Sequence, residues 1–154
     1  MSDGEINLVS VDKSVEVTQR VEFSCSYLVP RGGGYDLNSV NYKFEATVCG
    51  SKAYESTGRV ISFEDFIRVI KSILPNKSFI YDKNDDKQKV LAEAFRDCGV
   101  FSYVFDGDIS AERILEEISL MLVEALHVYP GVYLKETKLR ENASSYVSWK
   151  QEEK

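Results

Sequence analysis

Apolar and polar residues alternate along two segments in the first third of the chain. Residues 14–29 and 40–49 interleave β-branched or aromatic residues with polar ones, which is the pattern of a strand with one buried face. The glycine-rich stretch 31–34 lies between them and supplies the backbone freedom that a turn requires. The pattern therefore predicts a β-hairpin.

Helical periodicity appears in two later segments. Ser62 is placed to cap a helix, with Asp65 three residues later, and apolar residues then recur on one face until Pro75. A second apolar run at helical spacing begins after Ser110 and ends at residues 130–131, which are Pro-Gly. We expect one long helix in each segment.

The rest of the chain gives one clear signal and two open ones. Residues 132–139 and 145–149 resemble a second strand pair, and Glu-Asn at 141–142 supplies turn chemistry between them. Residues 90–95 suggest a short extra helix, and residues 100–105 form an apolar, strand-like run. Periodicity alone leaves these last two assignments open.

Together these elements predict an α+β fold with an antiparallel four-stranded sheet, made of two hairpins, and two long helices on one face. Such a sheet leaves exposed edges, which pair with other strands unless they are protected, so we expect an oligomer. The 154 residues, 44% of them hydrophobic, suffice for one domain with a core. We expect a single domain over 1–154, with frayed termini at 1–13 and 150–154.

Charge and cysteine content narrow the possible partners and the compartment. The formal net charge of -6 argues against binding a nucleic acid or an anionic membrane, since both select basic surfaces. Cys25, Cys49 and Cys98 are widely spaced and odd in number, which fits neither a disulfide framework nor a thiolate zinc site. The acidic start and the absence of an apolar run near the roughly 20 residues of a membrane span predict a soluble, cytoplasmic protein.

Five short motifs occur along the chain in a fixed order. They are Phe23-Ser24-Cys25-Ser26-Tyr27, Asn38-Ser39-Val40-Asn41-Tyr42, Thr57-Gly58-Arg59-Val60-Ile61-Ser62-Phe63, Ser110-Ala111-Glu112 and Glu136-Thr137. In this order the chain resembles the family of 6-pyruvoyltetrahydropterin synthase and 6-carboxytetrahydropterin synthase. The family's motifs look like Phe-Ser-Ala-x-His, His-Gly-His-Asn-Tyr, Thr-Gly-Met-Val-x-Asp-Phe, Pro-Thr-x-Glu-Asn and Glu-Thr.

The resemblance covers about residues 21–149, almost the whole chain. It implies the tunnel fold, in which sheets of several subunits join edge to edge into a barrel with the helices outside. It further implies trimers that stack into hexamers, with sites between subunits. We therefore expect a homotrimer or a homohexamer.

The zinc ligands of the family do not match. In the family three histidines hold zinc, and the matching positions here are Tyr27, Asn38 and Val40. Valine has no donor atom, and tyrosine and asparagine are weak substitutes for neutral imidazole. We predict no zinc site of the family type and no cofactor. The one histidine, His127, falls at the end of the second predicted helix, where a structural role is expected.

The family's catalytic cysteine also has no counterpart. Its position matches the stretch 33–36, in which Asp36 is the only base. Strand alternation puts Cys25 on the same face as Tyr27, so its thiol is a conceivable replacement. The favoured interpretation of Cys25 is a small buried hydrophobic residue, because free cysteines are commonly buried.

The second catalytic element of the family, Leu-Asp-His, is matched most closely by Tyr81-Asp82-Lys83. The resemblance makes Asp82 and Lys83 candidate catalytic residues, although a shift of one residue would put Asp82 at the histidine position. A lysine acts as a base near neutral pH only if burial or neighbouring cations lower its pKa. Because nearby aspartates favour the ammonium form, a solvated loop over 82–89 is the favoured interpretation.

Glu136 is the strongest candidate for ligand binding. A carboxylate can accept hydrogen bonds from the ring N–H and the exocyclic amine of a pterin or guanine edge together. The resemblance implies that Glu136 anchors such a ring, with Thr137 and Ser110 as further binding residues. Ser110 is equally well explained as a helix N-cap.

The sequence leaves three hypotheses for the function of the protein. The leading hypothesis is a divergent, zinc-free relative that binds a pterin or purine-like small molecule without the family's lyase chemistry. The first alternative is an active pterin-converting enzyme that works without zinc through Asp36, Asp82, Lys83 or Tyr27. The second alternative is a structural or regulatory subunit that assembles with an active paralogue.

Overall fold

The computed structural model describes residues 15–50 and 60–151. The predicted frayed segment 1–13, residues 57–59 of the third motif and residues 152–154 lie outside the described residues. The elements follow one another as β1 (Val15–Arg31), β2 (Gly34–Gly50), α2 (Phe63–Ile73), β3 (Ser78–Asp82), α3 (Asp86–Asp97), β4 (Phe101–Phe105), α4 (Ala111–Ala125), β5 (Val132–Arg140) and β6 (Tyr146–Lys150).

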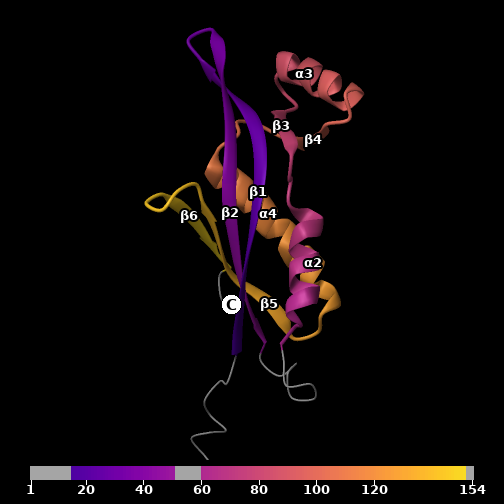
Figure 1. The fold of residues 1–154 in the computed structure, drawn as a ribbon, viewed down its shortest axis with the longest axis vertical. Coiled ribbons are helices and arrows are strands. Elements are labelled where there is room, and N and C mark those ends of the chain that lie inside the picture. The colour runs from indigo at the N-terminus through magenta and orange to yellow at the C-terminus, as the bar shows by residue number, and fades with distance from the viewer. Residues whose placement is uncertain (1–14, 51–59, 152–154) are drawn as a thin grey trace, which may run out of the picture.

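The strands form one mixed sheet of six strands in the order β4-β3-β1-β2-β5-β6 (Figure 1). Strands β1, β2, β5 and β6 are antiparallel neighbours and contain both predicted hairpins. Strands β3 and β4 extend the sheet beyond β1 in parallel. The α+β class is therefore confirmed, whereas the purely antiparallel four-stranded sheet is wrong. The error arises because β3 is short and its first three residues are all buried, so that it carries no alternation.

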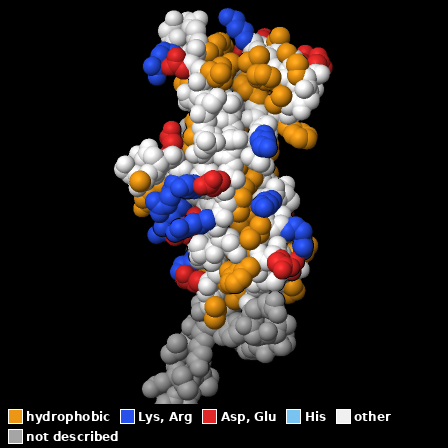
Figure 2. Space-filling view, in the orientation of Figure 1, with side chains coloured by type: hydrophobic (Ala, Val, Ile, Leu, Met, Phe, Trp, Pro, Cys, Tyr) orange, Lys and Arg blue, Asp and Glu red, His pale blue; other side chains and the backbone are white. Residues whose placement is uncertain are grey.

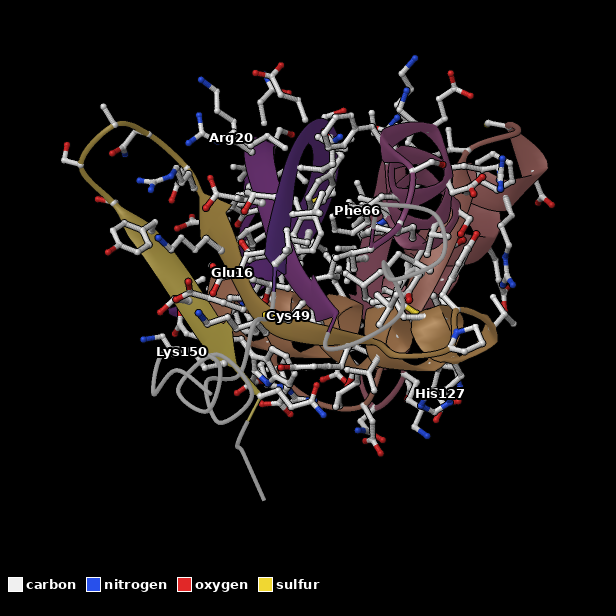
Figure 3. The ribbon with its side chains drawn as sticks, turned by 90° about the horizontal axis from the view of Figure 1, so that it is seen from below. Glu16, Arg20, Cys49, Phe66, His127 and Lys150 are labelled. Atoms are coloured by element: carbon white, nitrogen blue, oxygen red, sulfur yellow. The ribbon has the colours of Figure 1, made fainter. Side chains whose placement is uncertain are left out.

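Helices α2 and α4 cover one face of the sheet, as predicted. On β1 and β2 that face carries Phe23, Cys25, Tyr42 and Phe44, which are buried, because successive residues of a strand point to opposite faces. We call it the core face. In Figure 3, Phe66 of α2 lies between the sheet and the helices.

Helix α3 lies on the opposite side, over β3 and β4. Phe79 of β3 pairs with Ser26, whose side chain points away from the core face. The ring centroid of Phe79 is 5.0 Å from that of Phe95 in α3. Over the rest of the sheet this second side, the open face, has no helix above it among the described residues. In Figure 2, Lys and Arg side chains gather at mid-height on the left of the molecule, where Figure 1 has β5 and β6.

Local signals explain where the two long helices begin. The Ser62 hydroxyl accepts a hydrogen bond from the backbone N–H of Asp65 at 3.1 Å, and the Ser110 hydroxyl accepts one from Arg113 N–H at 3.2 Å. Both serines are therefore N-caps. None of the helices in the described parts of the chain is long and apolar enough to cross a membrane.

Candidate functional site

The three positions that match zinc ligands lie together on the core face. Tyr27 of β1 is paired with Asn38 of β2, and Cys25 is paired with Val40 two residues away along the strands. Tyr27 is only 6% exposed, and its hydroxyl lies 3.3 Å from that of Tyr42. Burial, followed by this hydrogen bond, raises the pKa of Tyr42 well above its usual range. The phenol of Tyr42 therefore stays neutral.

This donor set does not fit zinc. The Tyr27 hydroxyl is already engaged by Tyr42, Val40 offers no donor, and the Asn38 amide is a poor replacement for imidazole. Burial raises the pKa of the neighbouring Cys25 thiol to about 12, so no thiolate is available at neutral pH. Within residues 15–50 and 60–151, no group of three or more His, Cys, Asp or Glu side chains is arranged to hold a metal ion.

His127 lies far from these positions. It follows α4, its side chain is exposed, and its Nδ1 is 3.6 Å from a carboxylate oxygen of Glu124 (Figure 3). The structural role expected for His127 from the sequence stays a prediction.

Asp36 sits near the tip of the first hairpin. It shares the strand face of Asn38, two residues later, and its Oδ2 is 2.9 Å from Nε of Arg31. The carboxylate is therefore part of an exposed ion pair beside the turn, on the same side of the hairpin as Tyr27.

Asp82 and Lys83 make contacts that organise turns. Asp82 ends β3, and its Oδ1 accepts hydrogen bonds from the backbone N–H groups of Asn84 at 2.9 Å and Gly107 at 3.0 Å. The Lys83 side chain is 54% exposed, and its Nζ lies 3.6 Å from Oδ2 of Asp106. Asp82 thus ties the turn after β3 to the segment after β4. Their catalytic roles stay predictions.

The predicted solvated loop over 82–89 is wrong in its second half, because residues from Asp86 onward form the first turn of α3. Asp85 is the N-cap and accepts from the backbone N–H groups of Lys87 at 3.0 Å and Gln88 at 3.3 Å. It also accepts from the Tyr35 hydroxyl at 2.7 Å, which is the largest cause of the lowered pKa of Asp85. The hairpin tip is therefore tied to the start of α3.

Glu136 lies on the open face, in a row of paired residues that crosses four strands. The row contains Thr18, Thr47, Glu136 and Lys150. The Glu136 side chain is 25% exposed, and its Oε2 is 3.8 Å from Nζ of Lys150. Among the described residues, Lys150 on the outermost strand β6 is the one ionic partner of this carboxylate. The carboxylate oxygens therefore keep acceptor capacity for a ligand.

Thr137 and Ser110 do not converge on Glu136 within one chain. Thr137 points to the core face, is fully buried, and lies 2.6 Å from the Ser119 hydroxyl of α4. Ser110 caps the same helix nine residues earlier, which is about 13 Å along the axis. Whether either residue binds a ligand stays a prediction.

The hydroxyl pair of Ser119 and Thr137 gives a first testable expectation. We expect Thr137→Val alone to lower the free energy of unfolding by about 1–3 kcal/mol, because Ser119 keeps a buried hydroxyl without its partner. Adding Ser119→Ala should recover part of that loss, because both polar groups are then gone. Urea unfolding of wild type, both single variants and the double variant measures the coupling. Strictly additive losses would contradict a structural pair.

The sequence did not identify the neighbours of Glu136 on the open face. Tyr146 of β6 has the Arg140 guanidinium 4.6 Å from its ring centroid and the Lys138 ammonium at 5.6 Å. Alternation along β5 would have put Glu136, Lys138 and Arg140 on one face, which is the signal that could have found them.

Comparison with known proteins agrees with this geometry at the level of the fold. No protein-family model and no curated protein matches the amino-acid sequence. Solved structures do match. An uncharacterized protein of Wolinella succinogenes aligns with a TM-score of 0.67 and 15% identity, over 90% of this chain and 99% of its own.

Two 6-pyruvoyl tetrahydropterin synthases also match in structure. The enzyme of Plasmodium falciparum has a TM-score of 0.63 and 17% identity, over 90% of this chain and 98% of its own. That of Caenorhabditis elegans has a TM-score of 0.62 and 11% identity, over 90% of this chain and 96% of its own. The chain therefore has the fold of the 6-pyruvoyl tetrahydropterin synthases, which confirms the resemblance at the level of the fold.

Proposed function

We propose that this chain, with its 6-pyruvoyl tetrahydropterin synthase fold, binds a pterin or purine-like ring without the zinc-dependent chemistry of that family. The observation that carries the proposal is the buried hydroxyl pair of Tyr27 and Tyr42. Tyr27 stands at one of the positions where the resemblance puts zinc ligands, and its hydroxyl, engaged by Tyr42, offers no suitable donor set together with Asn38 and Val40.

Glu136 is the residue proposed to hold the ring. Its carboxylate lies on the open face, with Nζ of Lys150 3.8 Å from its Oε2 on one side, and an ionised carboxylate offers acceptors only. A charged carboxylate can accept from two adjacent donors on one edge of a guanine-like ring. No similar role is needed from Thr137, which is engaged with Ser119.

We further propose that the chain assembles as a trimer or a hexamer. Strand β1 pairs with β3 only at Cys25–Tyr27, so the rest of this edge of β1 has no partner strand among the described residues. At the opposite side of the sheet, β6 is the outermost strand. Both strands therefore offer backbone groups that a second copy can pair with. Glu136 is one strand from the β6 edge, so a neighbouring copy at this edge would border the proposed site.

Metal analysis tests the first half of the proposal. We expect well below one zinc ion per chain in protein purified without chelator and dialysed against metal-free buffer, because the available donors are poor ligands. Elemental analysis gives the ratio directly. About one zinc ion per chain after dialysis would overturn the zinc-free proposal.

Ligand titration tests the second half. Biopterin, neopterin and guanine are titrated calorimetrically into the wild-type protein, which gives the number of sites per chain, and sedimentation equilibrium of the same sample gives the number of chains per assembly. We expect saturable binding of at least one ring. Failure of all three rings to bind would favour the alternative of a structural or regulatory subunit. Conversion of a pterin substrate by the metal-free protein would instead favour the alternative of an active enzyme.

A further inference from the structure

A concave region lies on the open face toward the other end of the first hairpin from Glu136, between that hairpin and α3. It has a volume of about 420 Å³. Residues from three sources line it: the hydroxyl and amide side chains of β1 and β2, the start of β3, and the end of α3 with the residue before β4. They include Ser24, Ser26, Ser39, Asn41, Lys77, Phe95 and Val100. We call this region the hairpin groove.

The hairpin groove is separate from the proposed ring site. Glu136 is in the row of Thr18, and Ser24 is six residues further along β1. At about 3.3 Å per residue, the two rows are about 20 Å apart. The groove therefore does not depend on the function proposed for Glu136.

Several polar side chains of the groove have no partner within the described part of the chain. Within the described part of the chain, no hydrogen bond or ion pair engages the side chains of Ser24, Asn41 or Lys77. The hydroxyls of Ser26 and Ser39 lie 3.0 Å apart and form a donor and acceptor pair on the floor. None of the described residues that line the groove is acidic.

Lys77 is held at the rim by an unusual backbone. Its φ is +55°, a conformation that side-chain-bearing residues seldom adopt, and its N–H donates to the carbonyl of Ser24 at 2.6 Å. The side-chain amide oxygen of Asn76 accepts from the Ser24 N–H at 3.1 Å. These two hydrogen bonds fix the start of β3 against β1, and Lys77 belongs to the fixed turn. Non-glycine residues in such conformations are concentrated at ligand clamps and active sites.

The opposite wall is apolar. Phe95 packs against the buried ring of Phe79, and Val100 is partly exposed beside it. A wall of this kind stabilises a flat or branched apolar body, whereas the floor offers hydrogen bonds at one end. An ammonium with hydroxyls and no carboxylate selects an acceptor-rich, negatively charged group at that end.

We propose that the hairpin groove is a binding site for a small organic anion, a carboxylate with an aromatic body. The carboxylate lies against Lys77 and the hydroxyls of the floor, and the ring lies against Phe95 and Val100. The absence of an acid among the lining residues distinguishes this chemistry from the Glu136 site, which suits ring donors.

Benzoate and its neutral analogue benzamide are the probes, titrated into the full-length protein by ligand-observed NMR. We expect benzoate to bind at least about fivefold more tightly than benzamide, because only benzoate forms the charge-assisted contact with Lys77. Lys77→Gln should weaken benzoate by about five- to tenfold and leave benzamide unchanged.

Two variants control for general effects of charge and backbone. Lys71→Gln removes an exposed lysine of α2 and should leave benzoate affinity within about twofold. Lys77→Arg keeps the charge in the same backbone conformation and should bind benzoate like the wild type. Equal affinity of the wild type for benzoate and benzamide would overturn the proposal, as would a loss in Lys71→Gln equal to that in Lys77→Gln. Absence of saturable benzoate binding to the wild type would overturn it too, whatever the outcome of the ring titrations.

Discussion

Replacing Phe66 with alanine is expected to lower the free energy of unfolding by about 3–5 kcal/mol. The Phe66 side chain is 0% exposed and belongs to the core between the sheet and the helices α2 and α4. Its removal loses the transfer free energy of the ring and leaves a cavity that rigid neighbours fill incompletely. The position is thus decisive for packing α2 against the core face.

Phe63 offers a matched control on the same helix. It begins α2, but 64% of its surface is exposed, so Phe63→Ala should change stability by about 1 kcal/mol or less. Urea unfolding of both variants is compared with wild type at one chain concentration, since any assembly of chains contributes to the measured stability. Similar losses for the two variants would contradict the packing described for α2.

The sequence predicts the parts of the fold that are specified locally. Ser62 and Ser110 cap their helices as expected, and the alternation of residues in β1 and β2 places the hairpin correctly. The strands reach closer to the turn than predicted, to Arg31 and from Gly34. Polar residues near the tip hide that extension, because alternation loses its contrast where neither face is fully buried.

The sequence predicts poorly what depends on distant partners. Strand β3 forms because residues from Ser78 onward pair with residues from Cys25 onward, about fifty positions earlier. A five-residue segment whose first three residues are all buried has no alternation that reveals such a partner. The N-cap Asp85 is a usable signal for α3, but the surrounding aspartates favour the prediction of a solvated loop.

The candidate site shows the same division. The hairpin register explains why Tyr27 and Asn38 face each other, and alternation alone places Glu136 and Thr137 on opposite faces. The hydroxyl pair of Tyr27 and Tyr42 was not predictable in this way, since it depends on how two buried rings pack. The residues at the zinc positions can thus be predicted from the sequence, whereas the hydrogen bond that engages the Tyr27 hydroxyl is found only in the structure.

Glu136→Gln is expected to weaken the binding of a pterin or purine-like ring by about ten- to hundredfold. Glutamine keeps the shape of the side chain but exchanges one carboxylate acceptor for an amide donor, which leaves one ring donor without a partner. The loss of the contact with Lys150, 3.8 Å away at the surface, should change folding stability by less than about 1 kcal/mol. A weakened affinity is therefore attributable to the ligand contact.

Calorimetric titration of biopterin, neopterin and guanine into Glu136→Gln and wild type measures this loss. Glu116→Gln is the matched control, because Glu116 is an exposed residue of α4 on the other side of the sheet and carries the same charge. It should leave affinity within about twofold of wild type. If Glu136→Gln binds the ring as tightly as wild type, Glu136 is not the anchor. If both variants weaken binding equally, the effect comes from overall charge and Glu136 is not a direct contact. Both substitutions remove the same charge, but only Glu136 is proposed to touch the ring.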